Sequence, residues 1–198
     1  INISWKEKEV LDHKNMGLKK RKYKKLGILG GTFDPPHLGH LKISKIVIKK
    51  LGLPTFLWAV TKKNPLKKKP LLKLNKRIEL CKKLTRKDKR IKVQSFDKLI
   101  KSSKTINLLK YVKRVNNNSK IFFIIGSDCL VNFHKWNKWK EIANICQIVV
   151  FPRTGFVEKT RTCKAFKALG KQKVVFIASK RIHISSSKIR RNYLEYKY

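Results

Sequence analysis

Six short apolar runs alternate along the chain with longer segments of helical period, and no other feature restricts the fold as strongly. The apolar runs, rich in β-branched and aromatic residues, are 26–30, 55–60, 91–96, 120–126, 147–151 and 173–178. The segments of helical period are 38–51, 73–84, 104–115, 136–143, 158–169 and 186–194. Nearly continuous apolar strands separated by helices predict a mostly parallel sheet covered on both faces. The sequence therefore predicts a doubly wound α/β fold, in which ligands bind at the carboxyl ends of the strands.

The length and composition of the chain predict one domain. With 198 residues, 41% of them hydrophobic, the chain can bury a full core, and no shift in composition indicates a second domain. We expect residues 1–25 to form a basic, poorly ordered extension and residues 26–198 to form the domain. No apolar run is long enough to cross a bilayer, and the start of the chain lacks the apolar stretch of a secretory signal. These features predict a cytoplasmic protein.

The formal net charge of +40 is typical of proteins that bind nucleic acids or anionic membranes. Here, however, the lysines are spread over almost every segment, and isoleucine and asparagine are also abundant, as in proteins encoded by AT-rich genomes. The sequence shows no helix-turn-helix, zinc or RNA-binding signature. We therefore expect no specific nucleic acid and no membrane as partners, although part of the charge should attract phosphorylated substrates. A basic nucleic-acid-binding protein remains the alternative from a different class.

The four cysteines give no indication of a metal site. Cys81, Cys129, Cys146 and Cys163 show neither C-x-x-C spacing nor a histidine at metal-ligand distance in the sequence. They are predicted to be reduced thiols, and no metal held by the protein's own side chains is expected.

The stretch "GILGGTFDPPHLGH", residues 27–40, predicts a site for phosphate groups. It begins as a buried strand, and Gly30 and Gly31 remove side chains where that strand must turn. Pro35 and Pro36 stop the strand, and a helical pattern follows them. A phosphate chain can therefore approach backbone amides at the end of the strand, beside the positive end of the next helix.

Two histidines stand at the start of this helix. His37 and His40 are three residues apart, so they share one face of the first turn. Two imidazoles beside a helix N-terminus can both donate hydrogen bonds to a phosphate group. The alternative is a capped helix with two ordinary surface histidines. The pair is too closely spaced for a zinc-peptidase helix and lacks the glutamate of that motif.

Three blocks of sequence together resemble one enzyme family. The string "GGTFDPPHLGH" resembles the signature of the H-x-G-H nucleotidyltransferase superfamily, in the form found in bacterial nicotinate mononucleotide adenylyltransferases. Near the C-terminus, "ISSSKIR" resembles the second signature, I-S-S-T-x-I-R, with Ser187 where threonine is usual. Between them, "IIGSDCLVNFHKWNKW" resembles the family block G-A-D-x-L-x-x-F-x-x-W, with Ser127 in place of alanine. The resemblance runs from about Leu26 to Arg191 and implies a single-domain, Rossmann-like nucleotidyltransferase fold.

The resemblance also implies a reaction in NAD biosynthesis. The phosphate of nicotinate mononucleotide attacks the α-phosphorus of ATP, which gives nicotinate adenine dinucleotide (deamido-NAD) and pyrophosphate. Because the nucleophile is already an anionic phosphate oxygen, the reaction needs no base and no covalent intermediate, and catalysis consists of alignment and charge stabilisation. Mg²⁺ is expected to arrive with ATP, held by phosphate oxygens and water, since the sequence shows no carboxylate cage for it.

Individual residues receive roles from the same resemblance. The catalytic residues are His37 and His40, on the α- and β-phosphates, and Arg190, on the departing pyrophosphate. The ATP-binding set is Gly30, Gly31, Thr32, Phe33, His37, His40, Ser185, Ser186 and Arg190. The set that binds the mononucleotide is Thr32, Asn64, Lys67, Thr105, Asp128, Trp136 and Arg153, in which Trp136 stacks on the pyridine ring.

Several alternatives remain open from the sequence. Trp136 could instead join Phe133 and Trp139 in a hydrophobic cluster under the loop. The enzyme could prefer nicotinamide mononucleotide, or could be a phosphopantetheine adenylyltransferase or a cytidylyltransferase of the same superfamily, although the Trp136 block and the Gly-Gly pair argue against the last two. A homo-oligomer also stays open.

Overall fold

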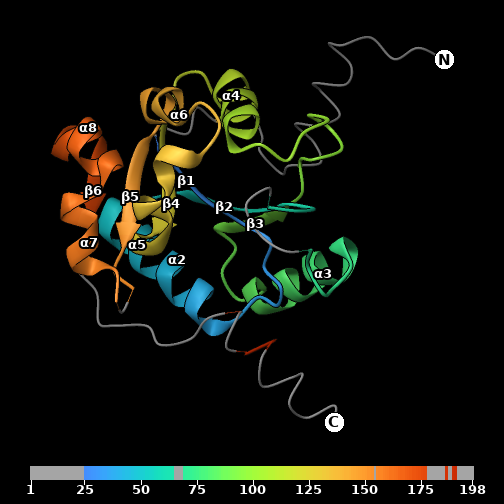
Figure 1. Ribbon diagram of the computed structural model, residues 1–198. Coiled ribbons are helices and arrows are strands. Elements are labelled where there is room, and N and C mark those ends of the chain that lie inside the picture. Colours follow the sequence, from blue (N-terminus) through green and yellow to red (C-terminus); the bar gives the residue numbers. More distant parts are fainter. Residues whose placement is uncertain (1–24, 65–68, 154, 178–185, 187–188, 191–198) are drawn as a thin grey trace.

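The computed structural model describes residues 25–64, 69–153, 155–177, 186 and 189–190. Within them, six strands form one sheet in which every neighbouring pair is parallel (Figure 1). Across the sheet the strand order is β3-β2-β1-β4-β5-β6. In chain order the strands are β1 (Lys25–Gly31), β2 (Thr55–Val60), β3 (Ile91–Gln94), β4 (Lys120–Gly126), β5 (Gln147–Phe151) and β6 (Val174–Phe176). The predicted doubly wound α/β fold is therefore confirmed.

Helices connect the strands and cover both faces of the sheet. They are α2 (Leu38–Leu51), α3 (Leu74–Thr85), α4 (Thr105–Val115), α5 (Ser127–Val131), the 3₁₀ turn η1 (Phe133–Lys135), α6 (Trp139–Ile145), α7 (Val157–Thr162) and α8 (Lys164–Lys173). In Figure 1, α4 and α6 lie above the sheet, whereas α2 and α3 lie below it. The two layers explain why the strand sequences are apolar along their whole length rather than alternating.

Successive strand residues pack into two separate cores, one on each face of the sheet. In β4, for example, Phe123 belongs to the core beneath α4, α6 and α8, whereas Phe122 and Ile124 belong to the core beneath α2 and α3. All six residues of β2 are buried in the same alternating way. The period of two along each strand therefore supplies both cores.

The order of strands places a switch point between β1 and β4. From β1 the chain moves outward to β2 and β3, then returns to pair β4 with the other side of β1 and moves outward again to β5 and β6. Loops that leave β1 and β4 thus turn to opposite sides of the sheet. A crevice at the carboxyl ends of these two strands is where open α/β sheets bind ligands.

The structure corrects several predicted element boundaries. The helix predicted over 136–143 is α6, which begins only at Trp139, with Lys138 in the left-handed region (φ 53°) just before it. The short helices α5 and η1 precede it, where no helix was predicted. The helix predicted over 158–169 is two helices, because Cys163 is extended (φ −67°, ψ 150°) between α7 and α8. The third strand ends at Gln94 rather than at residue 96.

The ends of the chain leave part of the domain prediction untested. Residues 1–24 lie outside the described residues, whereas Lys25 already belongs to β1. Most of the helix predicted over 186–194 also lies outside them, although residues 186, 189 and 190 are helical. Among the described residues, no helix combines the length and apolar character that a membrane span requires.

Candidate active site

A cavity of about 360 Å³ lies at the carboxyl ends of β1 and β4. We call it the α2 cavity, because the first turn of α2 forms part of its wall. It is lined by twelve of the residues singled out in the sequence, namely Gly30, Gly31, Thr32, Phe33, His37, His40, Asn64, Asp128, Trp136, Arg153, Ser186 and Arg190. Of the others, Thr105 lines an adjoining cavity, and Lys67 and Ser185 lie outside the described residues.

The first turn of α2 holds the two histidines in a fixed relation. The His37 backbone N–H donates to Nδ1 of His40 (3.2 Å), and the His40 N–H donates back to the His37 carbonyl (2.9 Å). Since Nδ1 of His40 accepts a hydrogen bond, the neutral His40 ring carries its proton on Nε2. The two ring centroids are 3.8 Å apart. The geometry therefore presents His40 as a donor through Nε2, beside His37.

Aromatic packing supports the His40 ring. Phe33 is buried and adopts a positive φ of 49°, which turns its ring toward the core. Its centroid lies 4.9 Å from that of His40 and 4.9 Å from that of Trp58, with which it is stacked. Trp58 in turn donates through Nε1 to the buried hydroxyl of Ser44 on α2 (2.8 Å). This stack limits the orientations that the His40 imidazole can take.

His37 is a buried imidazole, with 8% of its surface exposed. Burial, assisted by the positive charge of Arg153, lowers the pKa of His37 from its ordinary value to about 4. Neither ring nitrogen finds a hydrogen-bond partner among the described residues. A buried polar group without a partner costs about 1–3 kcal/mol. A ligand that hydrogen-bonds to His37 would recover that cost.

The two predicted signatures meet at the rim of the α2 cavity. The Ser186 hydroxyl donates to the carbonyl oxygen of Pro35 (2.9 Å), and Arg190 donates through Nη1 to the carbonyl oxygen of Asp34. The same nitrogen lies 3.8 Å from the Asp34 carboxylate. Segments near opposite ends of the sequence thus form one surface, with a guanidinium beside the two histidines.

Asp34 is a residue of this site to which the sequence analysis gave no role. Its carboxylate is 3% exposed and accepts hydrogen bonds from the backbone N–H groups of Leu71 (2.8 Å) and Leu72 (3.0 Å). These bonds fix the segment before α3 against the β1–α2 loop. An acidic residue inside the first signature, in a chain with only 11 acidic residues, is the signal that could have identified it.

Asp128 and Arg153 form an ion pair at the ends of β4 and β5, with 3.2 Å between Oδ2 and Nη1. The Arg153 N–H also donates to the Ser127 hydroxyl (2.8 Å). A Cβ atom on Gly126 would lie only 2.3 Å from Oδ1 of Asp128, so a larger residue there would displace the carboxylate of this pair. Oδ1 itself is buried and has no partner among the described residues, so it can still accept a hydrogen bond.

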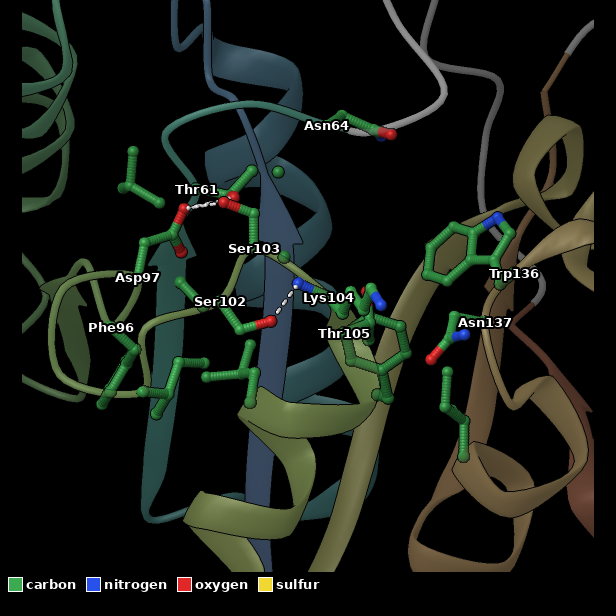
Figure 2. Close-up of a pocket in the computed structure, with 18 of the residues that line it drawn as sticks. Thr61, Asn64, Phe96, Asp97, Ser102, Ser103, Lys104, Thr105, Trp136 and Asn137 are labelled. Carbon is green, nitrogen blue, oxygen red and sulfur yellow. Dashed lines mark hydrogen bonds between the residues drawn. The ribbon is translucent and has the colours of Figure 1, made fainter.

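A second cavity, of about 230 Å³, adjoins the first and is shown in Figure 2. We call it the α4 cavity, because it lies at the start of α4. Its wall includes Thr61, Phe96, Asp97, Ser102, Ser103, Lys104, Thr105, Lys135 and Asn137. Four residues line both cavities: Gly30, Gly31, Asn64 and Trp136. The two cavities are therefore neighbouring parts of one site, with Trp136 at their junction.

The position of Trp136 is compatible with both alternatives considered from the sequence, a hydrophobic cluster and contact with a ligand. Its ring packs against Phe133 (centroids 5.2 Å apart) and Phe123 (6.2 Å), and Phe133 also contacts Trp139 (6.2 Å). The aromatic cluster under the loop is thus present. The indole is nevertheless only partly buried and lines both cavities, so it can still contact a ligand.

The comparisons with known proteins agree on one family. A model of the cytidylyltransferase-like family matches residues 28–192. A Pelagibacter ubique protein named "Probable nicotinate-nucleotide adenylyltransferase" is 43% identical over 171 residues, which are 86% of this chain and 94% of that protein. The chain belongs to the nicotinate-nucleotide adenylyltransferase family. A member of the same name from Agrobacterium fabrum is 43% identical over 131 residues, which are 66% of this chain and 70% of that protein.

Solved structures support the fold of this family member. The Plasmodium falciparum nicotinic acid mononucleotide adenylyltransferase complexed with NaAD superposes with a TM-score of 0.67 at 18% identity, over 85% of this chain and 83% of that one. A second structure of the same enzyme, complexed with APC, gives the same TM-score at 17% identity.

The side chains of the α2 cavity suit phosphate groups. No group of three or more histidine, cysteine, aspartate or glutamate residues in the part of the chain that the structure describes is arranged to hold a metal ion. The Mg²⁺ expected with ATP stays a prediction. Imidazoles, a guanidinium and a helix N-terminus make the α2 cavity suitable for a polyanion.

Proposed function

We propose that this protein catalyses adenylyl transfer from ATP to nicotinate mononucleotide, with release of pyrophosphate and formation of nicotinate adenine dinucleotide. Membership of the nicotinate-nucleotide adenylyltransferase family supports the reaction, and the similarity extends over 86% of the chain. The arrangement of the site supports it independently. Two adjoining cavities of different character share one wall, as a reaction between two nucleotides requires.

The observation that carries this proposal is the division of polar and aromatic groups between the two cavities. The α2 cavity contains His37, His40 and Arg190, which suit a triphosphate. The α4 cavity is lined by apolar and aromatic side chains such as Phe96, with Trp136 at the junction, which suits a flat ring. ATP therefore occupies the α2 cavity, and the pyridine ring occupies the α4 cavity.

The proposed chemistry is a direct displacement at the α-phosphorus of ATP. An oxygen of the mononucleotide phosphate forms the new bond, and the bond between the α-phosphorus and the bridging oxygen of pyrophosphate breaks. That oxygen keeps the electron pair, so pyrophosphate leaves as an anion. No proton must be removed from the nucleophile, and the protein's contribution is alignment and stabilisation of charge.

The side chains of the α2 cavity divide this work. His40 donates through Nε2 to the phosphate at which charge develops, and its ring is held for this by the hydrogen bond to Nδ1 and by its tilted contact with Phe33. Arg190 and Ser186 stand on the side of the departing pyrophosphate. Mg²⁺ bound to the ATP phosphates would neutralise further charge. We also propose that backbone amides of Thr32 and Phe33 hold the reacting phosphates.

The α4 cavity favours a carboxylate on the pyridine ring over a carboxamide. Lys104 and Lys135 belong to its wall, and the N-terminus of α4 begins there at Thr105. Both lysines and the helix dipole favour a negative group, with the helix N-terminus alone contributing about 0.3–1 kcal/mol. We therefore propose nicotinate mononucleotide as the preferred substrate over nicotinamide mononucleotide.

The test is a substrate panel read as pyrophosphate release. ATP or CTP is offered with nicotinate mononucleotide, nicotinamide mononucleotide or phosphopantetheine, and we expect the fastest turnover with ATP and nicotinate mononucleotide. A preparation of His40→Ala, purified in parallel, controls for contaminating enzymes. Faster turnover with phosphopantetheine or with CTP would overturn the proposed reaction, and equal turnover with the two pyridine mononucleotides would overturn the proposed preference.

A further inference from the structure

In the turn that follows β2, Thr61–Lys62, the backbone N–H and carbonyl groups and the Thr61 hydroxyl are all hydrogen-bonded to residues of other segments. The Thr61 N–H donates to the carbonyl of Gly31 at the end of β1 (2.9 Å). The Thr61 and Lys62 carbonyls accept from Arg77 (2.8 and 3.1 Å). The Thr61 hydroxyl and the Lys62 N–H donate to one carboxylate oxygen, Oδ2 of Asp97 (2.9 and 2.7 Å). This turn leads directly to Asn64, which lines both cavities.

Arg77 holds the turn from the side of α3. Its side chain is 1% exposed, and besides the two carbonyls of the turn it donates to the carbonyls of Thr32 and Leu72. The guanidinium therefore joins the segment after β1, the turn after β2 and the segment before α3. A planar group with five N–H donors can reach acceptors in several directions at once.

Asp97 holds the same turn through its carboxylate. It lies between β3 and α4, and its Oδ2 also accepts a hydrogen bond from the Ser103 hydroxyl. The adjacent Ser102 hydroxyl accepts from the Lys104 N–H (3.1 Å), at the start of α4. In Figure 2, the Asp97 carboxylate points toward Thr61 and Ser103, which lie next to each other. One carboxylate oxygen thus joins two walls of the α4 cavity.

We propose that Asp97 is a positioning residue for the mononucleotide, which fixes the wall that carries Asn64 relative to the wall that carries Thr105. This inference rests on the proposed function, because it assigns the α4 cavity to the pyridine ring. Three donors converge on Oδ2, so Asp97 acts through the groups it holds rather than as a ligand. Without it, the Thr61 hydroxyl, the Lys62 N–H and the Ser103 hydroxyl lose a shared acceptor and the two walls can separate.

Loss of Asp97 should affect the binding of only one of the two substrates. Asp97 lines the α4 cavity but is absent from the wall of the α2 cavity, and the Arg77 bonds that anchor Thr32 do not depend on it. Loss of Asp97 should therefore weaken the mononucleotide and leave ATP nearly unaffected. A displacement of about 1 Å in a positioning group can cost on the order of 100-fold in rate.

The experiment compares three variants by steady-state kinetics with each substrate varied in turn. For Asp97→Ala we expect the KM for nicotinate mononucleotide to rise about 10- to 100-fold, with the KM for ATP changed less than about 2-fold. Asp97→Asn keeps an acceptor oxygen and should recover most of the loss. Asp88→Ala is the matched control, because Asp88 also accepts three hydrogen bonds, all from Arg90, and lines neither cavity.

A double-mutant cycle tests whether Asp97 acts through the loop before α4. Ser103→Ala alone should raise the KM for the mononucleotide less than Asp97→Ala does. Because Ser103 acts through Asp97, the effect of the double variant should be smaller than the sum of the two single effects expressed as free energies. Additive effects would contradict the proposed connection. If Asp97→Ala does not fold, Ser103→Ala provides the test by itself: it should raise the KM for the mononucleotide and leave the KM for ATP nearly unchanged, and equal changes in both would overturn the inference.

Separate outcomes decide the two proposals. If the wild-type protein does not form nicotinate adenine dinucleotide, the proposed function fails, whatever Asp97 does. If the wild type is active and Asp97→Ala raises both KM values equally, or lowers only the active fraction, Asp97 has a merely structural role and the further inference is overturned. Calorimetric titration with nicotinate mononucleotide alone gives a second readout that does not depend on turnover.

Discussion

Replacement of Arg77 by methionine should destabilise the protein strongly for a single substitution. The guanidinium is buried and donates to four backbone carbonyls, those of Thr32, Thr61, Lys62 and Leu72. Methionine fills a similar space but donates to none of them. At about 1 kcal/mol for each orphaned carbonyl, the low end for a buried polar group, the loss is about 4 kcal/mol.

Part of this loss should be recovered, because methionine carries no charge that must be buried. We therefore expect a net decrease of about 2–4 kcal/mol in the free energy of unfolding, out of a total of about 5–15 kcal/mol for a domain. Arg77→Lys keeps the charge and at most three donors without the planar fork, and should lose about half as much. Comparison of the two variants separates the effect of the lost hydrogen-bond donors on the free energy of unfolding from the effect of the lost charge.

The assay is urea unfolding followed by tryptophan fluorescence, for which the fully buried Trp58 is a suitable probe. Arg90→Met is the matched control. Arg90 is exposed and bonds to Asp88 (2.8 Å), and pairs of that kind contribute about 0–1 kcal/mol. If Arg77→Met lay within about 0.5 kcal/mol of the wild type with an unchanged denaturant slope, water would be replacing the guanidinium and the reasoning would be refuted.

Three further predictions concern the site. His40→Ala should lower turnover about 100- to 1000-fold without loss of fold, as for other preorganised donors to developing charge. His134→Ala is the control, because His134 lines neither cavity. Near-normal turnover in His40→Ala would show that His40 has only a structural role. Trp136→Ala should mainly raise the KM for the mononucleotide, whereas a raised KM for ATP alone would place the indole against adenine. His37 has a folded pKa of about 4, so between that value and about 6.5 the unfolded chain binds the proton and the folded protein does not. Stability should therefore fall as the pH decreases through this window, and His37→Asn should reduce the fall; an unchanged pH dependence would contradict the low pKa.

The strands could be predicted closely because their signal is local. All six residues of β2 are apolar or β-branched and buried, and the observed bounds of β2, β4 and β5 are those predicted. The region between β4 and β5 could not be predicted in this way. The apolar periodicity predicts a helix from residue 136, but Trp136 is extended (φ −76°, ψ 144°) and Lys138 is left-handed (φ 53°), so the helix begins only at Trp139.

The same difference separates the site residues that the sequence indicated from those it missed. His37, His40 and the two glycines stand together in one short string, so their chemistry could be inferred from spacing. Arg77 donates to backbone carbonyls, and Asp97 accepts from a backbone N–H and two hydroxyls, two of these three donors being more than 30 residues away. Bonds of this kind produce no recognisable spacing of residues in the sequence. A buried arginine also cannot be told from an exposed one among 51 lysine and arginine residues.

The parallel pairing of β1 with β4 also constrains when a nascent chain can become competent to bind nucleotides. Lys25 pairs with Lys120, so one wall of the crevice is synthesised long before the other. Three strands, β1 to β3, can associate while the rest of the chain is still on the ribosome. The crevice itself closes only after β4 has been inserted beside β1, and Ser186 and Arg190 reach its rim later still. The strands of half the sheet are therefore synthesised first, and a complete nucleotide site can form only after Arg190 has been added.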